Sequence, residues 1–70
     1  MTVVVDLIPY DDRGHEIIEE LEGIQEPPVE IRHYGHREYY ARAENLELAG
    51  FDAMLDRIDP TWREHLGRTA

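Results

Sequence analysis

Three histidines and two glutamates are the residues of this sequence best suited to hold a metal ion. His15 and Glu16 match the start of a His-Glu-x-x-His zinc motif, but Glu19 stands where the second histidine would be. His33 and His36 flank a possible turn, and together with the first group they would offer zinc or nickel a nitrogen-rich site. Nothing in the spacing makes these side chains converge, and surface histidines are common. We therefore predict no metal site and no cofactor, and keep a metal-dependent enzyme with histidine ligands as an alternative.

Other kinds of catalysis find little support in the residue types. The chain contains no serine and no cysteine, which removes two of the common nucleophiles. Its five glycines form no phosphate-binding cluster. General acid-base catalysis needs a titratable group in a pocket that excludes water, and a chain of 70 residues has a thin core in which to enclose one. The sequence predicts a protein that is not an enzyme.

The distribution of charge is the most informative feature of the sequence. The net charge is −9, from 16 carboxylates and seven arginines, with no lysine. Residues 1–31 hold nine carboxylates and one arginine, whereas residues 32–42 hold three arginines and one glutamate. The second of these segments also holds two histidines and three of the four tyrosines. The sequence therefore predicts a negative body with one positive, aromatic segment.

Glutamates are expected on the exposed face of a helix within the acidic segment. The residues concerned are Glu16, Glu19, Glu20 and Glu26. Side chains four apart on a helix lie about 6 Å apart, which is close to the spacing of successive phosphates in a nucleic-acid strand. One interpretation is a face that docks into a basic groove, in the manner of a nucleic-acid mimic. The other is an ordinary solvated helix in an acidic proteome, because a run of charge alone indicates little.

The positive segment contains the residue types that dominate binding surfaces. Its candidates for partner contact are Arg32, Tyr34, Arg37, Tyr40 and Arg42, and all but Arg37 are expected on one face of a hairpin. Arginine and tyrosine combine a large planar area with directional hydrogen bonds. They can also stack on the bases of a single strand, but a net charge of −9 repels nucleic acid. In a purely structural alternative, the arginines pair with carboxylates of their own chain and the tyrosines are interior.

Hydrophobic periodicity predicts the elements that position these residues. Alternation over residues 2–7 predicts a first strand, which ends at Pro9. Asp12 is the expected N-cap of a helix, and Pro27 and Pro28 end that helix. Its apolar stripe consists of Ile17, Ile18, Leu21 and Ile24.

A hairpin and a second helix are expected next. Residues 29–34 alternate as a second strand, and residues 37–43 return as a third, with a helix over residues 37–48 as the alternative. Asn45 is the expected cap of the second helix. The apolar stripe of that helix consists of Leu48, Phe51, Leu55 and Ile58, with Met54 beside it.

The end of the chain is expected to form a short helix and a frayed tail. Asp59-Pro60 matches an N-cap followed by a proline at the first helical position, and Trp62 and Leu66 would share one face of the turn. The prediction is one acidic domain over residues 1–66, with a frayed tail over residues 67–70. Its fold class is α+β, a β-α-β-β-α unit with a small three-stranded sheet and both helices on one face.

The function favoured by these features is protein binding without catalysis. No stretch is apolar enough to span a bilayer, and the N-terminus lacks the features of a secretion signal. We therefore expect a small cytoplasmic adaptor, inhibitor or antitoxin-like protein whose protein partner has a basic surface. The alternative from another class is an RNA- or single-strand-binding module. Without disulfides to support a thin core, a homodimer is also expected.

Overall fold

The first strand, β1 (Thr2–Pro9), determines which side of the molecule is buried. In the computed structural model, which describes all residues 1–70, its side chains alternate strictly between exposed and buried. Val3, Val5 and Leu7 point to the interior, and the residues between them point to solvent. Such alternation is expected of a strand that has one face against a core and one face in water.

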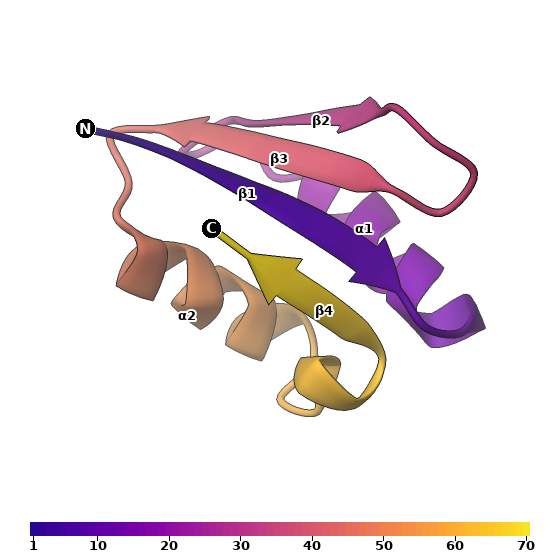
Figure 1. Ribbon diagram of the computed structural model, residues 1–70. Helices are drawn as coiled ribbons and strands as arrows, with labels where there is room; N and C mark the ends of the chain where they lie inside the picture. Colours follow the sequence, from indigo (N-terminus) through magenta and orange to yellow (C-terminus); the bar gives the residue numbers. More distant parts are fainter.

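Four antiparallel strands form one sheet in the order β2-β3-β1-β4, and two helices pack against the same side of it (Figure 1). The remaining elements are α1 (Asp12–Glu22), β2 (Val29–His33), β3 (Tyr39–Glu44), α2 (Leu48–Ile58), the 3-10 helix η1 (Trp62–Glu64) and β4 (Leu66–Thr69). The connectivity β-α-β-β-α-β with this strand order is the ferredoxin-like, split β-α-β arrangement. The α+β class and the placement of both helices on one face are confirmed.

A single apolar core lies between the sheet and the helices. It contains 14 buried hydrophobic residues and no buried polar side chain. The largest side chains that are almost completely buried are Trp62, Phe51, Leu7, Ile17, Leu21, Leu55 and Leu66. Because these come from β1, α1, α2, η1 and β4, the C-terminal segment is part of the core and not an appendage to it.

The sheet has one strand more than the sequence predicts. Residues 67–69, expected to be a frayed tail, belong to β4, and η1 ends at Glu64 before it reaches Leu66. The prediction of three strands was therefore wrong. Residues 67–69 have no apolar alternation of their own, and their strand conformation comes from pairing with the edge of β1, where Gly67 lies opposite Ile8.

The hairpin follows the sequence pattern more closely than the helix caps do. Residues 39–44 form a strand, so the helical alternative for this region was wrong, and Tyr39 and Ala41 face inward as expected. Asn45 does not cap α2 but adopts a left-handed turn with φ of 60° after β3. Glu47 occupies the N-cap position of α2 without a side-chain hydrogen bond.

The start of α1 packs closely against the backbone before β4. Asp11, and not the expected Asp12, is the N-cap, and its Oδ1 accepts a hydrogen bond from the Gly14 amide at 2.9 Å. The Tyr10 amide donates to the carbonyl oxygen of His65 at 2.7 Å. A Cβ atom at Gly14 would lie 2.3 Å from that same oxygen, so only glycine fits between the helix and this turn.

Gly14→Ala is expected to destabilise the fold by roughly 1–3 kcal/mol because the new methyl group overlaps a backbone oxygen. Helix propensity alone would give the opposite sign, a gain of about 1 kcal/mol. Urea denaturation measures the difference. Gly23→Ala is the matched control, because a Cβ atom there lies no closer than 3.4 Å to any atom and φ is −76°, so a change of at most about 1 kcal/mol is expected. A Gly14→Ala variant as stable as the control would show that this contact is absent.

Candidate protein-contact surface

The face of the sheet opposite the helices is covered by no other element (Figure 1). Side chains alternate along each strand, and residues directly opposite on neighbouring strands point to the same side of the sheet. The outward residues of β1, β3 and β2 therefore form one surface. Its residues are Thr2, Val4, Asp6 and Ile8 on β1, Tyr40, Arg42 and Glu44 on β3, and Glu30 and Arg32 on β2. We call this surface the open face.

Exposed apolar groups are concentrated on and around the open face. The chain has five exposed large hydrophobic side chains, and Val4 and Ile8 are two of them, with 51% and 44% of their surface accessible. Tyr10 lies against Gly67, since a Cβ atom there would be 2.5 Å from its hydroxyl oxygen. Gly67 is the residue opposite Ile8, so the Tyr10 ring extends the same surface over β4. Exposed apolar side chains that gather at one side of a molecule mark interaction sites more often than scattered ones do.

Tyr34 extends over the open face from the end of β2. Its hydroxyl donates a hydrogen bond to Asp6 Oδ1 on β1 at 3.2 Å, and its ring centre lies 6.0 Å from that of Tyr40. Partial burial, and then the bond to Asp6, raise the pKa of the Tyr34 hydroxyl, which therefore stays a neutral donor at pH 7. Tyr34 as a whole remains 54% exposed, so this residue combines a fixed position with accessible area.

The arginines of the open face are paired within their own strands. Arg32 Nε donates to Glu30 Oε1 at 2.7 Å, which raises the pKa of the guanidinium, and Arg42 Nη2 lies 3.3 Å from Glu44 Oε1. All four side chains are at least half exposed. With Asp6, the face carries three carboxylates and two arginines, for a net charge of −1. It is therefore nearly neutral and not a positive patch.

The structure brings together most of the expected hairpin residues. Arg32, Tyr34 and Tyr40 lie on the open face with Arg42, whereas Arg37 lies in the loop between β2 and β3 and forms no ion pair. Val4, Ile8, Tyr10 and Asp6 were missed. The alternation of β1, combined with the expectation that both helices cover one side of the sheet, would have placed Val4, Asp6 and Ile8 on the uncovered side.

The acidic helix lies in the layer opposite the open face. Arg13 pairs with Glu16 at 3.3 Å and with Glu20 at 3.5 Å, while Glu19 forms no ion pair. Glu26 lies beyond the end of α1, in a turn, so its expected place on the helix was wrong. Because α1 and the open face point to opposite sides of the molecule, one flat partner surface cannot contact both.

The histidines do not form a group of metal ligands. The ring of Tyr39 lies between two of them: its hydroxyl is 3.4 Å from His15 Nδ1, and its ring stacks on His33 at 4.4 Å. His36 is exposed in the hairpin loop. No three histidine, aspartate or glutamate side chains are placed to hold a metal ion together. The two imidazoles near Tyr39 act in packing.

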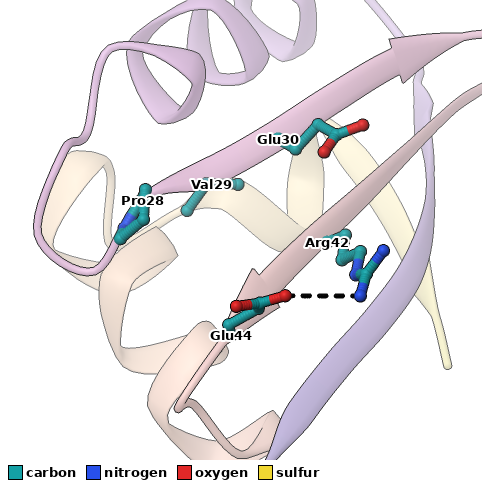
Figure 2. A pocket seen from close by; sticks show the side chains of 5 residues that line it. All are labelled: Pro28, Val29, Glu30, Arg42 and Glu44. Atoms are coloured by element: carbon teal, nitrogen blue, oxygen red, sulfur yellow. Dashed lines mark hydrogen bonds and ion pairs between the residues drawn. The ribbon is translucent and has the colours of Figure 1, made fainter.

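The hollows of the surface are shallow. The larger, of about 220 Å³, lies where β2 begins and β3 ends (Figure 2), and its lining residues are Pro28, Val29, Glu30, Arg42 and Glu44. The smaller, of about 70 Å³, lies beside the start of α1 and includes Asp11, His15 and Arg37. Only one lining residue of each is apolar. Sites that enclose small molecules are larger, deeper and mostly apolar.

Comparisons with protein-family models, with curated proteins and with solved structures found no match for this chain. Neither helix of the structure has the length and the apolar composition needed to cross a membrane.

One charged pair joins the start of α1 to the segment before β4. His65 Nδ1 and Asp11 Oδ2 are 2.8 Å apart. The hydrogen bond to Asp11 raises the pKa of His65 above its ordinary value of 6.5, and Asp59 and Glu64 contribute in the same direction. Conversely, the bond from His65 and that from the Gly14 amide lower the pKa of Asp11 below 3.8.

This pair is expected to make stability depend on pH. The raised pKa of His65 means that its contribution is complete below pH 6.5 and is lost as the pH rises through the raised value. The lowered pKa of Asp11 means that its contribution is present above pH 3.8 and is lost as the pH falls through the lowered value. The free energy of unfolding of the wild type, relative to His65→Gln, should therefore be largest between these limits and should decline above pH 6.5.

Urea denaturation across this pH range measures the difference. Asp11→Ser is the matched control, because serine keeps the N-cap of α1 but removes the partner of His65. It should show the same loss of pH dependence. A difference between wild type and His65→Gln that stays constant from pH 5 to alkaline pH would contradict the prediction.

Proposed function

We propose that this chain is a small, non-enzymatic protein-binding module that contacts its partner through the open face. The observation that carries the proposal is the gathering of Val4, Ile8, Tyr10 and Tyr34 at one uncovered side of a small sheet. Apolar and tyrosine side chains with charged pairs on the neighbouring strands are typical of a binding surface. Tyrosines contribute large contact area at low entropic cost, since they have few rotatable bonds.

The charges of the open face favour a protein over a nucleic acid. Single-strand-binding surfaces combine aromatic rings with a positive groove that follows the phosphate backbone. Tyr34 and Tyr40 offer the rings, but Arg32 and Arg42 already pair with neighbouring glutamates, and the whole chain repels phosphates through a charge of −9. The open face therefore has the aromatic rings that an RNA-binding surface needs but lacks the positive groove.

The net charge sets the kind of partner. A charge of −9 attracts a protein with a basic surface over long range and speeds the encounter, while the near-neutral open face makes the contact. The glutamates of α1 contribute to this attraction from the far side without touching the partner. The proposed role is that of a cytoplasmic adaptor, inhibitor or antitoxin-like protein.

Substitution on the open face is expected to abolish capture of the partner. Val4→Thr with Tyr34→Ala removes apolar area while keeping a β-branched residue in the strand, and it should weaken binding by about tenfold or more. The wild type and the variants, immobilised, are exposed to lysate of the native host, and retained proteins are identified by mass spectrometry. The partner is then produced and its binding kinetics are measured.

The matched control is Glu16→Lys with Glu19→Lys and Glu20→Lys on the acidic helix. We expect it to slow association and to weaken its salt dependence, with the dissociation rate unchanged. A partner that is lost with the helix variant but retained by the open-face variant would contradict the proposal. Tight, strongly salt-dependent binding of a single-stranded RNA oligonucleotide would support the RNA-binding alternative instead.

A further inference from the structure

The second strand, β2, has one unpaired edge. It lies at the border of the sheet and pairs only with β3, so the backbone groups on its other side face solvent. Such an edge is a template for pairing with another strand. Pro27 and Pro28 come directly before it, and because proline lacks an amide hydrogen, pairing along this edge is restricted to Val29–His33.

We propose that two copies of this chain associate by antiparallel pairing of their β2 edges, centred on Ile31. Ile31 is the middle residue of the five-residue strand, so this register gives the longest overlap that two copies can make. Around a twofold axis at Ile31, Glu30 of each copy lies opposite Arg32 of the other. Residues directly opposite in an antiparallel pair have Cβ atoms about 5 Å apart. The register of longest overlap is thus also the register that places opposite charges together.

The neighbouring registers lack this complementarity. A twofold axis at Glu30 places two glutamates opposite each other, and an axis at Arg32 places two arginines opposite each other; like charges in these positions destabilise pairing. A register shifted by one residue puts the open face of one copy on the helical side of the other. The opposite border of the sheet, β4, offers no such pair, because Arg68 is already held by Asp52 on α2 with bonds of 2.9 and 2.6 Å.

The side chains at the β2 edge are available for this contact. Glu30 and Arg32 have 51% and 65% of their side-chain surface exposed, and their pairing within the strand leaves other oxygens and N–H groups free. Ile31 points to the core side but is only partly buried, so contact with Ile31 of a second copy would complete its burial. In this register Tyr34 of one copy lies opposite Pro28 of the other, at the border of the larger hollow (Figure 2).

The dimer would have one continuous sheet of eight strands. Both pairs of helices lie on one side, and the two open faces join on the other into a surface twice as long. This inference does not depend on the proposed function, because it concerns the edge of the sheet and not its face.

The test is a set of charge variants examined by analytical ultracentrifugation and native mass spectrometry. Glu30→Arg and Arg32→Glu each replace two attractive cross-strand pairs by repulsive ones, so each variant alone should dimerise about tenfold or more weakly than the wild type. Mixed in equal amounts, they should form a heterodimer, because the two arginines of one chain then face the two glutamates of the other. The double variant Glu30→Arg with Arg32→Glu should dimerise like the wild type.

The controls are Glu44→Arg and Glu44→Gln on β3, at a carboxylate of similar exposure that lies inside the sheet, opposite Thr2 of β1 and not opposite any β2 residue. These variants should leave the dimerisation constant unchanged. Circular dichroism checks that each variant is folded, and Glu30→Gln, which removes both attractions without adding repulsion, should give an intermediate constant. A wild type that stays monomeric up to about 1 mM, a mixture without heterodimer, or an equal effect of the β3 variants would overturn the proposal.

Discussion

The alternation of side chains along β1 is the constraint on which the rest of the structure depends. β1 pairs with β3 on one side and β4 on the other, so its inward residues form the middle of the core and its outward residues form the middle of the open face. A shift of one residue in its register would expose Val3, Val5 and Leu7 and bury Asp6. The helical layer and the uncovered layer are therefore two consequences of one pattern.

Charge is distributed between these layers in a way that the sequence only partly reveals. Three of the seven arginines hold structure: Arg13 joins α1 to Asp59, Arg68 joins β4 to α2, and Arg63 lies over the ring of Trp62 at 4.2 Å. Because these arginines already make contacts within the molecule, the excess of carboxylates leaves the surface negative. The positive charge of residues 32–42 is largely offset in the folded protein, because two of the three arginines, Arg32 and Arg42, lie beside Glu30 and Glu44.

The sequence predicted what depends on local periodicity and missed what depends on distant partners. Apolar spacing predicted both helices, and alternation predicted the inward side of the hairpin. Both predictions work because a buried face needs an apolar side chain at each repeat of the helix or strand period. β4 has no such pattern, and its conformation comes from β1, some sixty residues earlier in the chain. The N-cap at Asp11 depends likewise on His65 and could not be distinguished from Asp12 locally. Tyr34 was a candidate by residue type, but its position over Asp6 follows from the strand order alone.

The central claim is that one side of the sheet is bare and carries the exposed tyrosines. Hydroxyl-radical footprinting of the purified protein, with mass spectrometry to locate the modified residues, measures this directly. Tyr10 and Tyr34, with 59% and 54% of their surface accessible, should be oxidised rapidly, and Trp62, with 2% accessible, should be protected despite its reactive ring. Oxidation of Trp62 as fast as that of Tyr34, or protection of both tyrosines in the monomer, would contradict the account.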